Sequence, residues 1–328
     1  MLDPVDRLIL DESPEPTGGV LVIDAPALAT EAGARGWEVV AYCDSLLDER
    51  LLTVPVVEEL TVGALAGVDL VLMRLPKAVA ALEEYAQRLA LVPGVRLVAG
   101  GRVKHMTRSM NEALAQRFGE VSASLGRQKS RVLHARDPQP GGIDFPRTAH
   151  QGDLDLTLAA HGGTFAGTRV DPGTRLLVNV LDQVVVPDGT TIDLGSGNGT
   201  LSALLARAGH RVLALDESRA ACLATAATAA ANGVSVEVRR ADALETVPAG
   251  SAPLIVCNPP FHVGTTKDSA VGLAMIDDAA RALAPGGELW LVFNAHLPYL
   301  PRLRQRIGSN DIVARNPKFI VTRSVRRG

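Results

Sequence analysis

The apolar positions in the first half of the chain form short runs that are separated by stretches with helical spacing. Strands that alternate with helices in short units predict a parallel sheet that is covered on both faces. Because this pattern continues to residue 135, the first half can form a domain by itself. The predicted strands cover residues 20–24, 38–44, 69–73, 95–99 and 130–135.

The second half of the chain repeats this order. Its apolar runs at 191–193, 212–216, 254–261, 286–292 and 318–322 align with 22–24, 40–44, 70–77, 94–99 and 129–133. This agreement indicates a tandem duplication, although two unrelated doubly wound domains would also share the order through the fold alone. The copies differ in chemistry, because the first has Ala25-Pro26-Ala27 where the second has glycines. We therefore interpret the first copy as degenerate.

The segment between the two copies is rich in proline and glycine. It contains Pro138, Pro140 and Pro146 and has little apolar periodicity before Leu154, which is typical of a linker or an inserted arm. A length of 328 residues also favours two domains. The predicted boundaries are a first domain at 1–136, a linker or arm at 137–165, and a second domain at 166–328.

A glycine loop follows the first strand of the second copy. Gly195, Gly197 and Gly199 allow a sharp turn and a close approach of a ligand to the helix that follows. A dinucleotide-binding loop has its third glycine one residue later, so this spacing favours a different adenosine ligand. Asp216 ends the next strand, where a carboxylate can accept the hydroxyls of a ribose. Simple helix capping remains an alternative for Asp193 and Asp216, as turn formation does for Asp242.

The apolar run at 255–257 ends in Asn258-Pro259-Pro260-Phe261. Neither proline has a backbone N–H, so the segment stops the strand and leaves hydrogen-bond acceptors at its end. The side-chain oxygen of Asn258 and the carbonyl of Pro259 can converge on one amino group, while Phe261 offers a flat face for a planar ring. This geometry suits the exocyclic amine of a nucleobase, although a plain turn would also contain these residues.

The small net charge of −3 conceals two basic segments. Eight Lys or Arg lie between residues 102 and 136, and eight more lie after residue 298. These segments could bind phosphates, or they could be ordinary solvated surface.

Three cysteines, Cys43, Cys222 and Cys257, lack the spacing of a metal or redox site and read as buried thiols. No apolar run has the length of a membrane span or a signal peptide. We therefore expect a cytoplasmic protein with no metal and no membrane association.

The second copy resembles the S-adenosylmethionine-dependent methyltransferases of the Rossmann type, and in particular the bacterial ribosomal-RNA guanine-N2 methyltransferases. The resemblance depends on residues 165–177, 193–199, 258–262, 286–289 and 294–299. It covers the second half closely and the first half in layout only. It implies two tandem Rossmann-like α/β domains of the class I methyltransferase type, of which the first is degenerate and serves as an RNA-docking part or a scaffold.

The resemblance also assigns roles to individual residues. The cofactor S-adenosylmethionine would be held by residues of the glycine loop and of the strand ends, namely Asp193, Gly195, Gly197, Gly199, Asp216, Asp242, Ala243 and Asn258. The segment Asn258, Pro259, Pro260 and Phe261 would carry the catalytic function by holding the guanine 2-amino group. Contacts with ribosomal RNA or a ribosomal subunit are expected from Phe261, His262, Arg323, Arg326 and Arg327.

Two other functions fit the same residues. The segment at 258–261 could hold the amine of an adenine or of a protein glutamine, since families that methylate those groups also use Asn-Pro-Pro with a following aromatic residue. The chain could also be a non-catalytic RNA-binding assembly factor. The sequence does not decide the oligomeric state.

Overall fold

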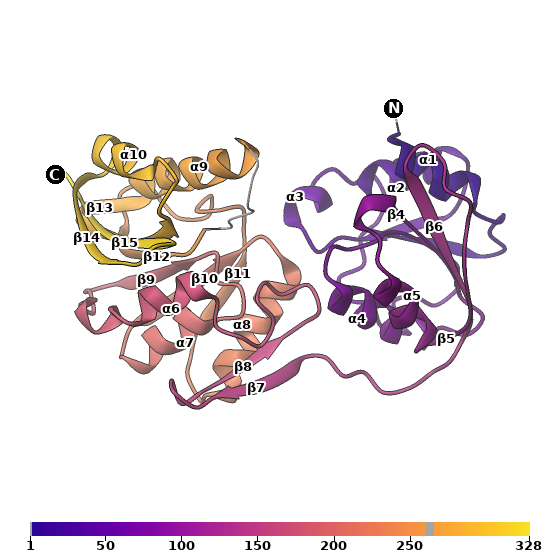
Figure 1. The fold of residues 1–328 in the computed structure, drawn as a ribbon, viewed down its shortest axis with the longest axis horizontal. Coiled ribbons are helices and arrows are strands. Elements are labelled where there is room, and N and C mark those ends of the chain that lie inside the picture. The colour runs from indigo at the N-terminus through magenta and orange to yellow at the C-terminus, as the bar shows by residue number, and fades with distance from the viewer. Residues whose placement is uncertain (1, 260–265) are drawn as a thin grey trace. The chain divides into compact units, whose positions relative to one another are not determined.

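The computed structural model describes residues 2–259 and 266–328. The chain divides into two compact units, each built on its own sheet (Figure 1). Unit 1 comprises Met1–Phe145 with His161–Gly163, and unit 2 comprises Pro146–Ala160 with Thr164–Gly328. The predicted α/β class with two tandem domains is confirmed.

Unit 1 contains a six-stranded sheet in the order β2-β1-β3-β4-β6-β5. The first four strands in this order are parallel, and β5 runs in the same direction, whereas β6 between β4 and β5 is antiparallel to both of its neighbours. The elements of unit 1 are α1 (Pro4–Asp11), β1 (Gly19–Ile23), α2 (Pro26–Ala34), β2 (Val39–Tyr42), α3 (Leu46–Glu49), β3 (Val68–Arg74), α4 (Val79–Leu89), β4 (Arg96–Arg102), η1 (Val103–His105), α5 (Arg108–Ala115), β5 (Phe118–Ala123) and β6 (Ser130–Pro138).

Unit 2 contains a seven-stranded sheet in the order β11-β10-β9-β12-β13-β15-β14, in which β15 alone runs antiparallel to the other strands. A separate hairpin pairs β7 with β8. The elements of unit 2 are β7 (Arg147–Gln151), β8 (Leu156–Ala160), α6 (Pro172–Val178), η2 (Leu181–Gln183), β9 (Thr190–Leu194), α7 (Thr200–Arg207), β10 (Arg211–Asp216), α8 (Arg219–Ala231), β11 (Glu237–Arg240), β12 (Ala252–Cys257), α9 (Thr266–Ala282), β13 (Leu283–Asn294), α10 (Tyr299–Arg306), β14 (Gly308–Arg315) and β15 (Phe319–Arg326).

The two sheets share one topology. The order β2-β1-β3-β4-β6-β5 corresponds strand for strand to β10-β9-β12-β13-β15-β14, and unit 2 adds β11 at its edge. In both sheets the last strand along the chain is the antiparallel one, and it inserts between the two strands that precede it in sequence, β6 between β4 and β5 and β15 between β13 and β14. The shared insertion is more specific than a general doubly wound order, so it supports the predicted duplication.

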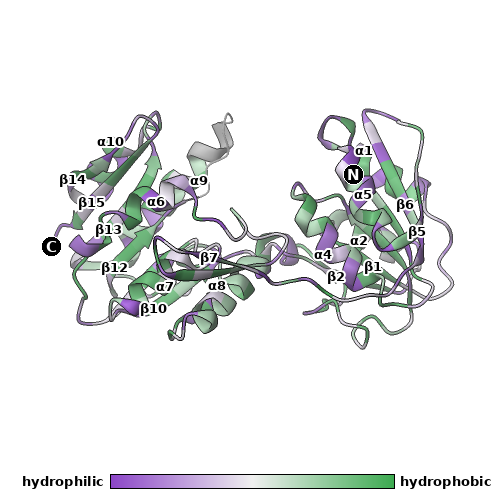
Figure 2. Cartoon of the chain, turned by 60° about the horizontal axis from the view of Figure 1, so that its bottom comes forward, coloured by the Kyte–Doolittle hydropathy of each residue, from purple (hydrophilic) through white to green (hydrophobic). Residues whose placement is uncertain are grey.

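Alternate residues of the central strands enter two separate cores. In β1, Leu21 and Ile23 pack on the face covered by α4 and α5, while Val20 and Val22 pack on the face covered by α1 and α2. Strands that are buried on both faces need a continuous apolar run, which is why they were evident in the sequence. Figure 2 shows this distribution, with hydrophobic strands inside each unit and hydrophilic residues on the outer faces.

The segment expected to be a linker or arm, residues 137–165, contains the hairpin of β7 and β8. Each strand has five residues, and β7 is polar with no buried position, so the hairpin has little apolar periodicity. The edge of β8 is satisfied by side chains of α8: Ala159 N–H donates to Thr228 Oγ1 at 2.9 Å, and Asn232 bonds both the N–H and the carbonyl of Thr157 at 2.9 and 2.7 Å. Residues 146–160 of this segment thus belong to unit 2.

The cysteine prediction needs one correction. Cys43 and Cys257 are buried, but Cys222 is half-buried, because it lies in the first turn of α8 with its thiol directed at the Asp216 carbonyl, 3.5 Å away. Within 2–259 and 266–328 there is no cluster of metal-ligating side chains. The described helices also include none that is long and apolar enough to cross a membrane.

Candidate functional site

The predicted site residues gather at one edge of the unit 2 sheet. The glycine loop at 195–199 follows β9, Asp216 ends β10, and Asn258 follows β12. Leu194 at the end of β9 pairs with Leu215 on one side and Cys257 on the other, so all three strands end at the same level. After β9 the chain adds β10 and β11 on one side of the sheet and then β12 on the other side, so the strand order reverses between β9 and β12. Ligands of open α/β sheets bind at such a reversal.

The glycine loop adopts a backbone that other residues rarely adopt. Gly195, Gly197 and Gly199 have φ of 76°, 56° and 76°. A Cβ at position 199 would also lie 2.9 Å from the Cα of Thr225 in α8. The loop therefore depends on glycine for both its conformation and its packing, and its backbone is open to a ligand.

Asp216 braces this loop from the neighbouring strand. Its Oδ2 accepts a hydrogen bond from Gly197 N–H at 2.9 Å, and its Oδ1 accepts one from Ser218 N–H at 3.0 Å. These bonds fix the Asp216 carboxylate beside the glycine loop. Its predicted contact with a ribose remains a prediction.

Asp193 is fully buried beneath the loop. Ser202 in α7 donates to its Oδ2 at 2.5 Å, whereas its Oδ1 has no hydrogen-bond partner within the described part of the chain. Burial raises the pKa of Asp193 to about 6. The structure thus shows Asp193 in contact with Ser202, near the start of α7. Cofactor binding by Asp193 remains a prediction.

Asp242 and Ala243 lie in the turn after β11. Ala243 has a φ of 45°, which is uncommon for a residue with a Cβ and is often found at ligand sites. The turn is held by Glu245, whose Oε1 accepts from Asp242 N–H at 3.0 Å, and by Asp278, whose Oδ2 accepts from Leu244 N–H at 2.8 Å. This turn is at the same edge as Asp216, since Ala241 N–H donates to the Asp216 carbonyl at 2.9 Å.

Asn258 has an amide whose two ends are in different surroundings. Its Nδ2 donates to Asp171 Oδ2 at 3.2 Å and to Thr174 Oγ1 at 2.8 Å. Its Oδ1 is buried and has no hydrogen-bond partner among the described residues. Because an ionised carboxylate only accepts hydrogen bonds, this network assigns the NH₂ group to the side of Asp171. The oxygen is then the end that is available to a donor.

A small pocket joins Asn258 to the glycine loop. A Cβ at Gly195 would lie 3.8 Å from the Asn258 carbonyl oxygen, so the loop and the end of β12 are in close proximity. The pocket is lined by Phe165, Ala166, Asp171, Thr174, Gly195, Ser196, Gly197, Asn198, Thr200, Leu201 and Asn258.

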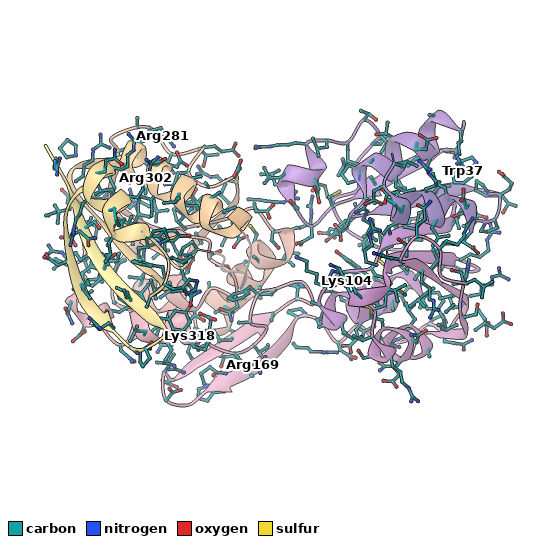
Figure 3. All side chains as sticks on the ribbon, turned by 45° about the horizontal axis from the view of Figure 1, so that its top comes forward. Trp37, Lys104, Arg169, Arg281, Arg302 and Lys318 are labelled. Carbon is teal, nitrogen blue, oxygen red and sulfur yellow. The ribbon has the colours of Figure 1, made fainter. Side chains whose placement is uncertain are left out.

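Two contacts of this pocket were not evident from the sequence. Asn198 donates to the carbonyls of Gly167 and Arg169 at 2.8 and 2.9 Å, which ties the segment before α6 to the glycine loop (Arg169 is labelled in Figure 3). Asp171, recognised in the sequence only as part of a helix start, contacts Asn258 across 87 residues of chain. No local pattern signals such a distant contact.

Of the other residues in the predicted catalytic segment, the structure describes Pro259 alone. Pro259 is buried at the end of β12. Pro260, Phe261 and His262 lie outside the described residues, so their roles remain predictions.

The arginines that were expected to contact RNA make contacts within unit 2. Arg323 pairs with Glu288 of β13, and Arg326 donates to the carbonyl of Leu283 at 2.9 Å. Arg327 donates to the Arg304 carbonyl at 3.4 Å. Arg323 and Arg326 therefore hold β15 in place, and reversing their charge would disturb the fold as well as any contact with RNA.

Comparisons with known proteins agree with this site. Residues 155–323 match the methyltransferase small domain, and residues 51–139 match the RLMG N-terminal domain. A ribosomal RNA large subunit methyltransferase G of Streptomyces avermitilis is 34% identical over 275 residues, covering 79% of this chain and 72% of that protein. The protein of the same name from Stutzerimonas stutzeri is 34% identical over 266 residues, covering 79% and 71%.

A solved structure matches almost the whole chain. It is the T. thermophilus 16S rRNA N2 methyltransferase RsmC in complex with AdoMet and guanosine, which has a TM-score of 0.83 and 26% identity and covers 99% of this chain and 92% of its own. The resemblance inferred from the glycine loop and the Asn258 segment is thereby confirmed. The chain belongs to the methyltransferase small domain family, in the group of proteins that also carry an RLMG N-terminal domain.

Proposed function

We propose that this chain transfers a methyl group from S-adenosylmethionine to the exocyclic N2 of a guanine in ribosomal RNA. The observation that carries the proposal is the buried Oδ1 of Asn258, an acceptor without a partner in the described chain, at a pocket shared with the glycine loop. An acceptor in this position suits a group that bears hydrogens and is to be methylated. The names of the relatives support the same reaction.

The residues of unit 2 fit the cofactor. A Cβ at Gly197 would meet no atom within 4 Å, so this part of the loop faces open space, with the Asp216 carboxylate bonded to the same residue's N–H. The glycine loop and Asp216 would hold the adenosine part, with Asp242 and Ala243 beside it. When bound, the sulfonium of S-adenosylmethionine supplies an electrophilic methyl group.

The contribution of Asn258 is alignment of the substrate. Its Oδ1 would accept a hydrogen from the guanine amine and so direct the nitrogen lone pair, and the Pro259 carbonyl is the proposed second acceptor. Holding the reacting atoms in one geometry can supply a large part of a rate enhancement, so the proton can leave after transfer without a dedicated general base. A base inside a duplex does not reach this edge, so the target is flipped out or unpaired.

The proposed target lies in the large ribosomal subunit. The relatives with 34% identity are named for the large subunit, and residues 51–139 match the domain that is named for the same group. The structure with 26% identity is named for 16S rRNA, so small-subunit RNA is the second candidate. Either substrate places the reaction in the cytoplasm.

Unit 1 offers a surface for the RNA backbone, which we name the two-loop basic surface: Arg102, Lys104, Lys129 and Arg131. Arg102 and Lys104 come from the end of β4 and from η1, Lys129 from the turn between β5 and β6, and Arg131 from the start of β6. The two segments are joined by bonds from Val103 N–H to the Lys129 carbonyl at 2.9 Å and from Arg102 Nη1 to the Gln128 carbonyl at 3.2 Å. Lys104, Lys129 and Arg131 are exposed (Lys104 is labelled in Figure 3). Exposed cations gathered from two loops suit phosphate groups.

The experiment that tests the proposal identifies the methylated product. Purified protein is incubated with labelled S-adenosylmethionine and, separately, with large-subunit RNA, small-subunit RNA and total protein, and the modified nucleosides and amino acids are separated by mass. We expect N2-methylguanosine from large-subunit RNA. N6-methyladenosine or methylglutamine would replace the proposed substrate, and cofactor binding without any transfer would favour the assembly-factor alternative.

A further inference from the structure

We infer that Asp171 and Thr174 are positioning residues, which hold the Asn258 amide with its oxygen toward the reacting amine. The inference rests on the proposed function, because it assigns these residues a part in orienting that substrate. Neither residue was among the predicted site residues. Their effect on the reaction would pass through Asn258.

The network consists of four hydrogen bonds around the start of α6. Asp171 Oδ2 accepts from the N–H groups of Gly173 and Thr174 at 2.7 and 3.1 Å, which caps the helix. The same oxygen accepts from Asn258 Nδ2 at 3.2 Å, and Thr174 Oγ1 accepts from that nitrogen at 2.8 Å. Both hydrogens of the Asn258 NH₂ group therefore have an acceptor, and both acceptors belong to one helix start.

The network has a direct consequence for which end of the amide faces the substrate. A carboxamide can rotate by a half-turn, which exchanges its oxygen and its nitrogen with little change in shape. In Asn258 this rotation would place Oδ1 against the Asp171 carboxylate and turn the NH₂ group toward the pocket. Two acceptors would then face each other on one side, and on the other side a donor would face the donor of the substrate. The network thus selects the orientation that accepts an amine.

The turn at Gly173 lies close to the network. A Cβ at Gly173 would lie 3.0 Å from Asp171 Oδ2, 3.3 Å from Phe319 Cε1 and 3.5 Å from Asn258 Oδ1. The amide and the carboxylate are therefore packed against the turn at Gly173. A site that is closely packed around its polar groups holds them in a narrow range of geometry.

The test compares substitutions that separate capping from positioning. Thr174→Val removes the hydroxyl acceptor and keeps the shape, while Thr174→Ser keeps the acceptor. Asp171→Ser keeps a side chain that can cap a helix and removes the carboxylate. Thr148→Val in β7 is the matched control, because Thr148 is exposed and lies outside the site.

We expect Thr174→Val and Asp171→Ser to lower kcat for RNA methylation about 10- to 100-fold, because orientation of the amine is lost. The Kd for S-adenosylmethionine should change less than about twofold, and Thr174→Ser and Thr148→Val should keep near wild-type kcat. A second readout is hydrogen exchange of the Asn258 side-chain NH₂ by NMR, which should be slow in the wild type and fast in both impaired variants.

The inference and the proposed function fail in different ways. If the wild type methylates no RNA, the proposed function is wrong whatever the variants do. If the wild type is active while Thr174→Val and Asp171→Ser retain full kcat, the positioning role is overturned and the proposed function stands. If kcat falls together with cofactor affinity and thermal stability in all three site variants, including Thr174→Ser, the residues act only in folding, which also overturns it.

Discussion

Unit 1 and unit 2 share one strand order, but the polar side chains at the corresponding sheet edge differ in their hydrogen-bond partners. In unit 1, Asp24 follows β1, and its carboxylate accepts from Asp44 N–H at 2.8 Å and from the Tyr85 hydroxyl at 2.9 Å. In unit 2, the loop after β9 is glycine, and Asn258 presents an acceptor with no partner among the described residues. The shared fold alone therefore does not create a ligand-binding site.

The ends of β3 and β12 differ in the same way. Arg74 ends β3 and bonds Asp3 and Asp6 at 2.6 and 2.7 Å, so the α1 region of unit 1 supplies internal partners at that position. The Asn258 amide at the end of β12 uses only its NH₂ group internally. A copy of the domain that fills its edge with its own side chains keeps the fold and loses the capacity to bind a ligand there.

A large effect that would sharpen this comparison is expected in the glycine loop. Gly199→Ala places a side chain at a left-handed φ of 76° and 2.9 Å from the Thr225 Cα, so the loop must shift. We expect cofactor affinity to fall on the order of 100-fold, since backbone strain and overpacking both cost free energy. Titration calorimetry with S-adenosylmethionine measures it.

Gly233→Ala is the matched control for that substitution. Gly233 has a φ of 63°, but a Cβ there would meet no atom within 4 Å. This variant should lose about 1 kcal/mol of stability from strain and bind the cofactor normally. Equal cofactor affinity in the two variants would contradict the role of the loop.

The next effect is on the stability of unit 1 at acidic pH. Burial would raise the pKa of Glu84, but hydrogen bonds from His161 at 2.8 Å and from Gly162 N–H at 2.8 Å, with the nearby charges, lower it to about 2. A lowered pKa stabilises the fold above the unfolded value of 4.5, and this stabilisation is lost as the pH falls toward 2. The contribution is about 3 kcal/mol.

Glu84→Gln removes this titration. The stability difference between the wild type and the variant, from urea unfolding between pH 5 and 2, should therefore shrink as the pH falls. A difference that is constant over this range would show that the Glu84 charge does not stabilise the fold.

A smaller effect is expected from breaking the ion pairs at the end of β3. Arg74→Leu leaves the buried carboxylate of Asp6 without its cation. Because the Arg74 side chain is 38% exposed, we expect a loss of only about 2 kcal/mol in the free energy of unfolding. Cofactor affinity should not change, and a change would contradict the view that this edge of unit 1 has no ligand.

The smallest effect is expected at the two-loop basic surface. Lys129→Glu should weaken RNA binding mainly at low salt and reduce the slope of log Kd against log salt by about one. Arg211→Glu is the control, since Arg211 is also exposed but begins β10, at the opposite end of that strand from Asp216. An equal reduction in both variants would mean that the effect is one of net charge.

Much of the architecture followed from the sequence because it depends on local pattern. The apolar runs at 20–24 and 212–216 correspond to β1 and β10, and the glycines at 195–199 marked the correct sheet edge. The hairpin of β7 and β8 was missed because side chains of α8 satisfy its edge, so its strands need little apolar periodicity.

The contacts that orient the site could not be predicted in the same way. Asp171 bonds Asn258 and Asn198 bonds Gly167 through the tertiary fold, over separations of 87 and 31 residues. The internal contacts of Arg323 and Arg326 likewise depend on how β15 inserts beside β13. The composition of this segment indicates positive charge, but it does not indicate which groups the two arginines contact.

The most direct test of the account is a single-turnover measurement of methyl transfer to ribosomal RNA by the wild type, Asn258→Leu and Asp24→Asn. The two substitutions preserve shape and change the corresponding edges of unit 2 and unit 1. We predict that Asn258→Leu lowers the rate about 100- to 1000-fold with cofactor still bound, while Asp24→Asn transfers at the wild-type rate. Full activity in Asn258→Leu, or an equal loss in Asp24→Asn with both proteins folded, would contradict the claim that only the edge of unit 2 carries the chemistry.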